Sequence, residues 1–586
     1  MKLSKINLYV AVFGLFCYAF LTDTYGKNFE PDARYLKMVK TYRFNPDGSY
    51  VYDYEHYLLY NSYFSFHRLY GETFIVYNPS FQRLEIMTAE TRMADGTLVK
   101  APQNAFNEVL PSWAAHSGAY NHLKEMVVTH TGLECGAVAH LHYSIFSSPE
   151  PQGFRHFVEP LVREVPIDTL IITIVVPEGF PFRFAENLPM KPKRVEEGEN
   201  TKYIFQITGI NAKEPFGLSA ECDEPRVIFQ IGEKSLEQLL KDFGEENSPL
   251  QSISDAQWDL ALDIRSNIAS VNTIAVPPTF HIFPIQNPVE TLKRNSGTSL
   301  EKAVLLAKQL REAGISSKLL LKFPDNTIDP SISNFASLLD VYVAIQRGDM
   351  PVVLSTETRQ TIGLSKQSGF VFVYLESDGL RKLWEKASLS VDSRVEFTLD
   401  SKGKCSGTET VLFHSGAPIF LSKTGNSVSA GELTGRNGDV ISYESTPEGK
   451  LSYTVQQKEV KVDMVDNVVT IAVPTVKYGF DVKHFSPLPD SFSNQICIDA
   501  PVKEQTVVEL MLPKEAKLFS DVVNQRYSGN FGTVEVSMKS KGSKVIFLRK
   551  IEITQSNIAP SDYPEFKRAM DFIGSQKANA IYVQLP

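Results

Sequence analysis

Hydrophobic and polar residues alternate with a period of two through most of residues 27–235. This alternation is clear in SYVYDYEHYLLY (49–60), ETFIVYN (72–78), TLIITIVVP (169–177) and RVIFQIG (226–232). Turn-forming groups such as NPDGS and ADGT separate these segments. Alternation bounded by turn residues is typical of half-buried strands, and no helical stretches lie between them. The pattern predicts an antiparallel, sandwich-like β domain over residues 27–235.

The pattern changes to a helical period near residue 236. Apolar residues recur at i, i+3 and i+4 in KSLEQLLKDFGEE (234–246), DAQWDLALDIRSNIASV (255–271) and TSLEKAVLLAKQLREAG (298–314). Three strand-like segments follow, SKLLLKF, SLLDVYVAIQ and PVVLST. A mixture of helices and strands predicts an α/β domain over residues 236–385.

Alternation returns over residues 386–586, for example in SRVEFTLD, NVVTIAVP and KVIFLRKIEI. The last 28 residues begin with a proline-led helical pattern and finish in AIYVQLP. This region is therefore expected to be a β-rich domain that ends in a helix and a strand. The fold class predicted for the chain is multidomain α+β.

The first 26 residues differ from the rest of the chain. Lys2 and Lys5 precede the apolar run INLYVAVFGLFCYAFL, and TYG at 24–26 offers small residues for cleavage before Lys27. This arrangement predicts a signal peptide and export to the periplasm or envelope of a Gram-negative bacterium, with an uncleaved membrane anchor as the alternative. The formal net charge of −9 and the lack of a basic patch argue against nucleic acid as a partner.

Four cysteines follow the predicted signal peptide: Cys135, Cys222, Cys405 and Cys497. They are far apart, with no CxxC spacing, so no metal site is expected from them. Pairs such as Cys135–Cys222 are compatible with an oxidising compartment, but single buried cysteines are the simpler expectation. No cofactor is predicted, because no phosphate-binding glycine motif is present.

The helix that begins near residue 298 has consistent local signals. Thr298 and Glu301 fit a capping box, and Gly314 follows the last helical residues as a left-handed stop. The apolar residues Leu300, Ala303, Val304, Ala307 and Leu310 define the expected buried stripe.

This central region resembles a transglutaminase-like domain of the papain-type fold. In that family a Gly-Asp-Cys-x-Asp-Lys-Ala motif opens such a helix, and GTSLEKA (297–303) is similar to it, with Ser299 at the position of the nucleophilic cysteine. Downstream, Ser337 in FASLLDVYVAI stands at or near the expected His position. Ser355 in VVLSTETRQT stands where the resemblance expects Asp.

The flanking regions agree with this resemblance. Segments within residues 72–179 resemble the sheet-rich domain of unknown function that precedes transglutaminase-like domains in secreted bacterial proteins, and the C-terminal region resembles the β domain that closes such chains. The resemblance implies a papain-type α/β core between two β-rich domains.

The catalytic chemistry of that family needs a thiolate, an imidazole and a third group that orients the imidazole. No cysteine lies between Cys222 and Cys405, and no histidine between His281 and His414. The residues Ser299, Ser337 and Ser355 are therefore interpreted as degenerate site positions. A serine nucleophile would need a base, for which Lys302, three residues after Ser299, and His281 are the candidates.

Two weaker candidates lie in the N-terminal region. His140 and His142 in HLH share one face of a predicted strand and could bind a metal, although a pair without a third ligand is more often structural. The segment WAAHSGAYNH (113–122) could line a ligand surface, although an ordered loop is the simpler interpretation.

These observations predict an exported, non-enzymatic protein that binds a peptide, a glycan or another partner in the cell envelope. The alternative is an amide-bond hydrolase or acyltransferase with Ser299 as nucleophile. A purely structural role is a third possibility.

Overall fold

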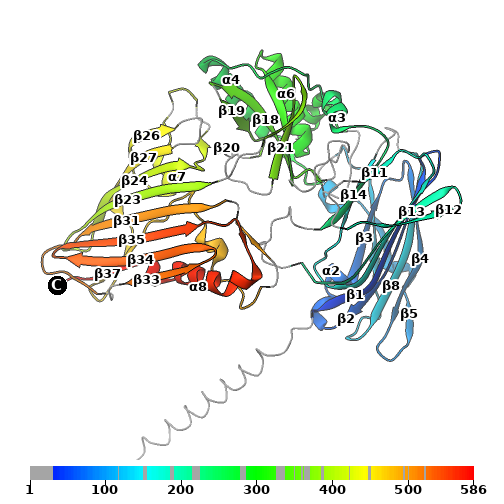
Figure 1. Ribbon diagram of the computed structural model, residues 1–586, viewed down its shortest axis with the longest axis horizontal. Coiled ribbons are helices and arrows are strands. Elements are labelled where there is room, and N and C mark those ends of the chain that lie inside the picture. The colour runs from blue at the N-terminus through cyan, green and yellow to red at the C-terminus, as the bar shows by residue number, and fades with distance from the viewer. Residues whose placement is uncertain are drawn as a thin grey trace, which may run out of the picture.

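The computed structural model shows three bodies, with the central one lying between two large sheet domains (Figure 1). The structure describes residues 31–586 except for the following: 116–117, 150–154, 185–189, 214–224, 277–284, 325–336, 349, 358–359, 362–369, 384–387, 421–422, 426, 446–450, 493–494, 499 and 520–522. Among the described residues, no helix is long and apolar enough to cross a membrane.

The N-terminal body is built on an eight-stranded sheet with the order β12-β13-β10-β1-β2-β8-β4-β5. Two three-stranded sheets, β11-β14-β9 and β3-β7-β6, share an aromatic-rich core with one face of the large sheet. Its elements are β1 (Ala33–Phe44), β2 (Tyr50–Tyr60), η1 (Tyr63–Phe66), α2 (Arg68–Gly71), β3 (Glu72–Tyr77), β4 (Gln82–Arg92), β5 (Leu98–Lys100), η2 (Gln103–Ala105), β6 (Phe106–Val109), η3 (Ser112–Ala114), β7 (Lys124–Thr129), β8 (Val138–Ser147), β9 (Arg155–Pro160), β10 (Ile167–Pro177), β11 (Phe182–Phe184), β12 (Lys193–Glu197), β13 (Asn200–Ile210) and β14 (Arg226–Ile231).

The central body has a five-stranded antiparallel sheet with the order β19-β18-β17-β21-β22. Helices α4 and α6 contact each other, and their apolar residues belong to one buried cluster with the inner residues of this sheet. Its elements are α3 (Leu236–Asp242), α4 (Asp255–Ala269), β15 (Asn272–Thr273), α5 (Pro288–Arg294), β16 (Ser296–Gly297), α6 (Ser299–Glu312), β17 (Ser317–Pro324), β18 (Asp340–Arg347), β19 (Met350–Leu354), β20 (Gln360–Thr361), β21 (Phe370–Glu376) and β22 (Gly379–Leu383).

The C-terminal body has a second eight-stranded sheet, β26-β27-β24-β23-β31-β35-β34-β33, and a four-stranded sheet, β28-β29-β37-β32, around one core. Its elements are β23 (Leu389–Leu399), β24 (Cys405–Ser415), β25 (Ile419–Phe420), α7 (Ala430–Thr434), β26 (Asp439–Ser445), β27 (Leu451–Val460), β28 (Val462–Val465), β29 (Val468–Ala472), η8 (Val482–Phe485), β30 (Ile496–Cys497), β31 (Val502–Met511), β32 (Lys517–Leu518), β33 (Asn524–Gly529), β34 (Gly532–Lys541), β35 (Lys544–Ile553), β36 (Asn557–Ile558), η9 (Pro560–Asp562), α8 (Tyr563–Gly574), η10 (Gln576–Ala578) and β37 (Ala580–Gln584).

The predicted fold class, α+β with a papain-type α/β core, is wrong. Strands dominate the whole described chain, and helices accompany mainly the central sheet. In that sheet every neighbouring pair of strands is antiparallel, and β18–β19 and β21–β22 are joined by short turns. The expectation of a purely antiparallel N-terminal sheet is also wrong, because β1 pairs with β10 in parallel.

Local alternation could not have predicted this parallel pairing in the N-terminal body. The segment Ile167–Pro177 of β10 is almost entirely apolar and β-branched, and Ile172 and Ile174 are fully buried beside β1. A strand in the middle of a sheet buries apolar surface against its neighbour whether that neighbour runs parallel or antiparallel. A local alternation pattern fixes which side chains are buried and does not encode the direction of the neighbouring strand.

Candidate functional site

Helix α6 begins as the sequence predicted. Thr298 Oγ1 accepts a hydrogen bond from Glu301 N at 3.2 Å, and Glu301 Oε2 accepts one from Thr298 N at 2.8 Å. These two bonds confirm the capping box. Gly297 precedes the cap where the chain is crowded, because a Cβ there would lie 2.8 Å from Thr291 Cγ2. Only a glycine fits that position without a shift of Thr291.

The end of α6 also follows the prediction. The C-cap is Ala313, and Gly314 has a φ of +74°, a conformation that favours glycine. The helix is more deeply buried than a single apolar stripe requires. Glu301 and Lys302 are each 1% exposed, and Leu305 and Leu306 are buried as well. Two charged side chains are thus enclosed at the start of the helix.

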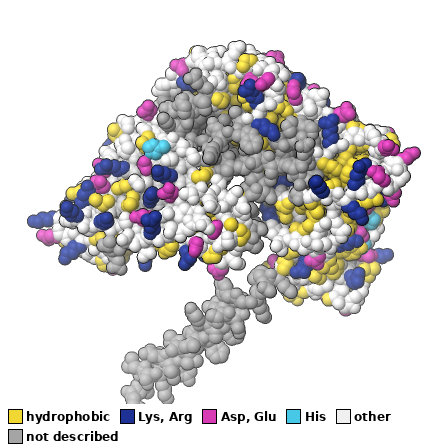
Figure 2. Space-filling view, in the orientation of Figure 1, with side chains coloured by type: hydrophobic (Ala, Val, Ile, Leu, Met, Phe, Trp, Pro, Cys, Tyr) yellow, Lys and Arg dark blue, Asp and Glu magenta, His cyan; other side chains and the backbone are white. Residues whose placement is uncertain are grey.

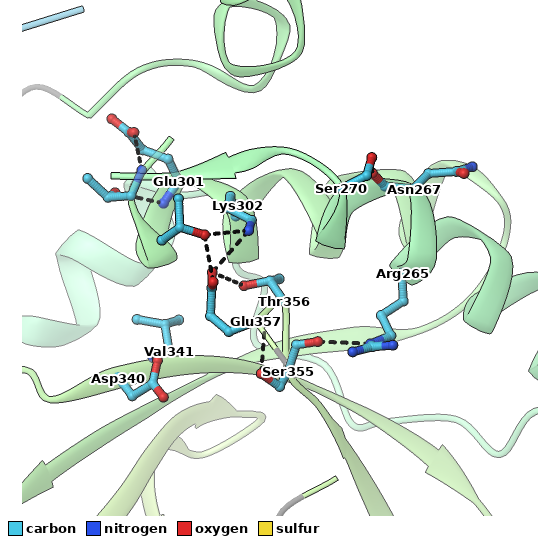
Figure 3. A network of polar contacts seen from close by, with 12 residues as sticks. Arg265, Asn267, Ser270, Glu301, Lys302, Asp340, Val341, Ser355, Thr356 and Glu357 are labelled. Atoms are coloured by element: carbon cyan, nitrogen blue, oxygen red, sulfur yellow. Dashed lines mark hydrogen bonds and ion pairs between the residues drawn. The ribbon is translucent and has the colours of Figure 1, made fainter. Parts of the chain in front are cut away.

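Lys302 is held by two oxygen atoms from different elements. Its Nζ donates to Thr273 Oγ1 at 2.7 Å and forms an ion pair with Glu357 Oε1 at 3.0 Å. Thr273 in turn donates to Glu357 Oε2 at 2.6 Å, so the three side chains form a closed triangle (Figure 3). Burial of an ammonium is costly unless a carboxylate and hydrogen bonds compensate it, which this triangle provides.

Glu357 is fixed by the chain that leaves β19. Its backbone N donates to Ser355 Oγ at 3.1 Å, and the Thr356 hydroxyl donates to Glu357 Oε1 at 3.3 Å. The Ser355 carbonyl accepts a hydrogen bond from Arg265 Nε of α4 at 2.9 Å. Figure 3 shows these groups together with Asp340 between the helices and the end of the sheet.

The topology gathers the predicted site positions at one end of the central sheet. Strand β18 begins at Asp340, shortly after Ser337, and its antiparallel neighbour β19 ends just before Ser355. The ion pair of Lys302 with Glu357 ties the start of α6, and hence Ser299, to the same end. Ser299 is half-buried on the first turn of α6. Asp340 stands at the start of a strand, and its Oδ1 accepts a hydrogen bond from Val341 N at 2.8 Å.

Ser337 lies in a different environment from the other two serines. It is 2% exposed, and its Oγ has no hydrogen-bond partner among the described residues. Ser355 is also buried, but its Oγ accepts a backbone hydrogen bond. Neither serine replaces the chemistry of an imidazole or of an orienting carboxylate, because a hydroxyl is neither a base nor an anion at neutral pH.

The N-terminal body reaches the start of α6 through the segment WAAHSGAYNH. The Tyr120 hydroxyl donates to Glu301 Oε1 at 3.0 Å, and burial beside this carboxylate raises the pKa of Tyr120. Tyr120, Ala114 and Leu123 also form an apolar cluster with Ile274 of the central body. This segment is therefore an ordered domain contact, with residues 116–117 outside the described residues.

Glu301 collects further hydrogen bonds at the same place. Gln286 donates to it twice, through its backbone N at 2.7 Å and through Nε2 at 3.1 Å. One carboxylate therefore serves the helix cap, the preceding loop and the neighbouring body. The sequence predicted only the capping bond between Glu301 and Thr298. The hydrogen bonds of Glu301 with Gln286 and Tyr120 were not predicted.

The structure also places His140 and His142, which the sequence offered as a weak candidate metal pair. His140 Nε2 lies 3.0 Å from Glu55 Oε1, and His142 Nε2 lies 2.9 Å from Asp53 Oδ1, on neighbouring strands β8 and β2. The two imidazoles therefore contact different acidic side chains, and His140 Nδ1 also lies 3.7 Å from Glu90 Oε1. Among the described residues, no group of three or more His, Cys, Asp or Glu side chains is arranged to hold a metal ion.

The cysteines have different surroundings. Cys405 is buried, and burial raises the pKa of its thiol to about 11, so little thiolate exists at neutral pH. Cys135 is exposed on the turn before β8. Cys222, which the sequence analysis considered as its partner, lies outside the described residues, as does His281.

Sequence reasoning missed three residues of the site: Thr273, Glu357 and Tyr120. Glu357 follows Ser355 by two residues, and an acidic residue so close to a degenerate acidic position could compensate for the loss of that acid. Tyr120 lies in the segment WAAHSGAYNH (113–122), which the sequence marked as a candidate ligand surface, but its contact with Glu301 was not predicted. Thr273 reaches the site from a distant part of the chain, and no local pattern marks it.

Comparisons with known proteins identify two regions of the chain. Residues 65–214 match the domain of unknown function DUF3857, and residues 490–583 match the domain of unknown function DUF3858. The expected N-terminal domain of unknown function is thereby confirmed. No curated protein matches the chain.

The chain is similar to a crystal structure from Parabacteroides distasonis described as that of a "putative protease". The two share 23% sequence identity with a TM-score of 0.70, over 95% of this chain and 100% of that chain. This likeness shows a shared fold alone.

Proposed function

We propose that this chain is an exported, non-enzymatic protein whose central body is a degenerate transglutaminase-like core. It binds a peptide, a glycan or another envelope partner at the end of the sheet where Asp340 and Glu357 lie. The two β-rich bodies hold this core in place. The signal peptide predicted over residues 1–26 supports the export step of the proposal.

The main support for the proposal is that the Lys302 side chain is already bonded to Thr273 and Glu357. This residue is the base that a serine mechanism on α6 would need, one turn after Ser299. Its ammonium is buried, bonded to Thr273 and paired with Glu357. An ammonium in such a pair has no lone pair with which to accept the Ser299 proton. The chain also offers no cysteine between 222 and 405 and no histidine between 281 and 414.

Ser299 supplies the second candidate function, an amide-bond hydrolase or acyltransferase. The observation in its favour is the position of Ser299 on the first turn of α6, where it is half-buried and close in sequence to Lys302.

An activity assay separates the two functions. Purified protein and the Ser299→Ala variant are compared on peptide anilides and on activated esters. We expect no turnover above buffer from either protein. Turnover that Ser299→Ala abolishes would establish the enzymatic alternative.

Binding is tested in the same preparation. Peptides and peptidoglycan fragments labelled with a fluorophore are titrated against the wild-type protein, Asp340→Asn and Asp378→Asn. Asp378 is the matched control, because it is an exposed aspartate on the β21–β22 turn at the opposite end of the central sheet. We expect Asp340→Asn to weaken binding at least fivefold and Asp378→Asn to leave it unchanged. Equal affinities of the two variants would place the ligand elsewhere.

A further inference from the structure

A pocket with a volume of about 700 Å³ lies in the central body beside α6. Its lining comes from α3, α5 and α6 and from the chain next to α3 and α5. Pockets that bury small ligands usually have volumes of roughly 300–1,000 Å³, so this one is large enough to hold such a molecule. Neither Asp340 nor Glu357 lines it, and it is therefore separate from the site at the end of the central sheet. We call it the α6 pocket.

The lining residues of α6 lie on one side of that helix. Val304, Lys308 and Arg311 follow one another at spacings of four and three residues, which places their side chains in one row. Glu301 begins the same row, three residues before Val304. Lys302 projects about 100° away from Glu301 around the helix, where it pairs with the carboxylate at the sheet end. The α6 pocket and the sheet-end site thus use different sides of α6.

Much of the lining of the α6 pocket is apolar. Val304 and Leu239 belong to the buried core of the central body, and Phe243 and Ile285 pack against that core. Pro288 at the start of α5 adds a further apolar group. A ligand that contacts these groups removes apolar surface from water, which favours binding in proportion to the area buried. The pocket therefore suits a ligand with an apolar body.

The charged part of the lining is mostly basic. Lys234, Lys308 and Arg311 line the α6 pocket, and Asp242 is the acidic residue among the described lining residues. Asp242 is paired with Lys234, so the excess positive charge belongs to Lys308 and Arg311. On the face of the central body drawn in Figure 2, basic side chains are interspersed with acidic and apolar ones. This distribution suits a ligand with one anionic group better than a polyanion, which needs a broad basic surface.

Lys308 is the basic group that is held most weakly. Its Nζ lies 3.7 Å from Glu312 Oε1, and the two side chains are 45% and 64% exposed. Water screens an exposed pair of this kind, so the Lys308 ammonium can turn to an anion in the pocket at little cost. Arg311 adds a second positive charge one turn further along, although its Nη1 is already bonded to Glu245 Oε1 at 2.7 Å. Lys308 is therefore the group expected to bind an anionic head.

The neutral polar side chains of the lining already form internal hydrogen bonds. Gln286 Nε2 donates to Glu301 Oε2 at 3.1 Å, and Asn287 Oδ1 accepts a hydrogen bond from Glu290 N at 3.0 Å. A sugar needs several free donors and acceptors for its hydroxyl groups, and a buried polar group without a partner lowers affinity. This lining therefore favours a ligand whose polar part is a single charged group.

We infer that the α6 pocket binds a small amphipathic carboxylate, a molecule with an apolar chain and one anionic head group. The chain lies against Val304, Phe243 and Ile285, and the carboxylate lies beside the Lys308 ammonium. The inference does not depend on the function proposed for the sheet-end site, because the two sites share no lining residue.

Displacement of a fluorescent fatty acid tests this inference on the full chain. The probe is dansylaminoundecanoic acid, whose emission rises when it leaves water, and decanoate and decanol compete with it. We expect the probe to bind and decanoate to displace it at a concentration about tenfold lower than decanol, because only decanoate carries a charge for Lys308. Decanol is the more apolar competitor, so apolar burial alone gives the opposite order. Equal potency of the two competitors, or no binding of the probe, would overturn the inference.

The variant Lys308→Met locates the bound carboxylate. Lys293→Met is the matched control, because Lys293 is an exposed lysine of α5 that lies 3.8 Å from Glu290 and does not line the pocket. We expect Lys308→Met to weaken the binding of decanoate about fivefold and to leave decanol unchanged, whereas Lys293→Met should change neither. Urea unfolding verifies that both variants are folded. Equal affinities of the two variants for decanoate would show that the carboxylate does not bind beside Lys308, and the inference would be wrong.

Discussion

At the scale of single residues, the two members of the Lys302–Glu357 ion pair differ in how deeply they are buried. We therefore expect the loss of one partner to cost more stability than the loss of the other. The Lys302 side chain is 1% exposed, whereas the side chain of its partner Glu357 is 34% exposed. Removal of the carboxylate leaves a buried ammonium without its counter-ion. Removal of the ammonium leaves a carboxylate that water can still reach.

The two halves of this ion pair should therefore differ in cost. We expect Glu357→Ala to lower the free energy of unfolding by about 3 kcal/mol and Lys302→Met by only about 1 kcal/mol, because breaking a buried pair is expensive mainly through the charge left behind. Urea unfolding followed by the fluorescence of the buried Trp258 in α4 measures both. Lys308→Met, at an exposed lysine of the same helix, is the control and should change little. Equal losses for the two variants would contradict the assigned asymmetry.

Buried histidines of the N-terminal body predict an acid-sensitive stability. Burial lowers the pKa of His130 to about 4, and the ring of His56, also buried, lies 6.0 Å away. The unfolded chain binds a proton near pH 6.5, so the contribution of His130 is complete above that pH and is lost as the pH falls from about 6.5 to 4. The full effect is roughly 3 kcal/mol for this pKa difference.

The thermal midpoint of the N-terminal transition should accordingly fall between pH 6.5 and 4. His130→Asn keeps a polar partner for Thr73, whose hydroxyl lies 3.0 Å from His130 Nε2, and removes the titrating group. We expect this variant to show a shallower decline in that pH window. An unchanged pH profile of the thermal midpoint would mean that His130 does not govern the acid response.

At the scale of elements, α6 depends on one residue in two ways. Glu301 completes the capping box and also accepts hydrogen bonds from Gln286 and Tyr120. Loss of the Thr298 hydroxyl removes one capping bond. Loss of the Glu301 carboxylate removes the second capping bond and also leaves buried donors of the neighbouring loop and body unpaired.

The two capping substitutions should separate these roles. We expect Thr298→Ala to cost about 1 kcal/mol, the usual value of an N-cap, and Glu301→Ala to cost at least about 2 kcal/mol because further donors lose their acceptor. Thr298→Ser keeps the hydroxyl and serves as the control. Chemical unfolding of the three variants measures the difference. A loss for Glu301→Ala no larger than that for Thr298→Ala would show that its other bonds contribute nothing.

At the scale of the whole molecule, Tyr120 connects two bodies of the chain. Its hydroxyl bond to Glu301 and the apolar cluster with Ile274 fix the N-terminal body against the start of α6. The site end of the central sheet is therefore framed by residues from two bodies. Its geometry depends on a contact between residues 181 positions apart in the sequence.

Tyr120→Phe isolates this connection, because the ring remains and only the hydroxyl is lost. We expect amide hydrogen exchange at Gln286 and over the first turn of α6 to become about tenfold faster, which corresponds to about 1.4 kcal/mol of local stability. Exchange in the strands of the C-terminal body should not change. Uniform acceleration across all three bodies, or none at the start of α6, would contradict the role assigned to this hydroxyl.

Most local features were predictable from the sequence, and the site itself was predictable only in part. The capping box of α6, the left-handed Gly314 and strands such as β17 and β19 follow from patterns within a few residues. The parallel pairings of β1 with β10 and of β23 with β31 do not, because alternation fixes which face of a strand is buried and not the direction of its neighbour. The fold class was predicted wrongly because the helical period over residues 236–385 was taken to indicate a papain-type α/β core, whereas that region holds a five-stranded antiparallel sheet and strands dominate the described chain.

The sequence by itself determined which reactive groups the central region lacks, since a missing cysteine or histidine needs no coordinates to be recognised. It also determined where α6 begins and ends, because caps act over a single turn. Only the tertiary structure decided that Lys302 is paired with Glu357 and Thr273, and that Tyr120 reaches Glu301. Those contacts join residues far apart in the chain, and their partners are chosen by how the sheets and helices pack, which no local pattern specifies.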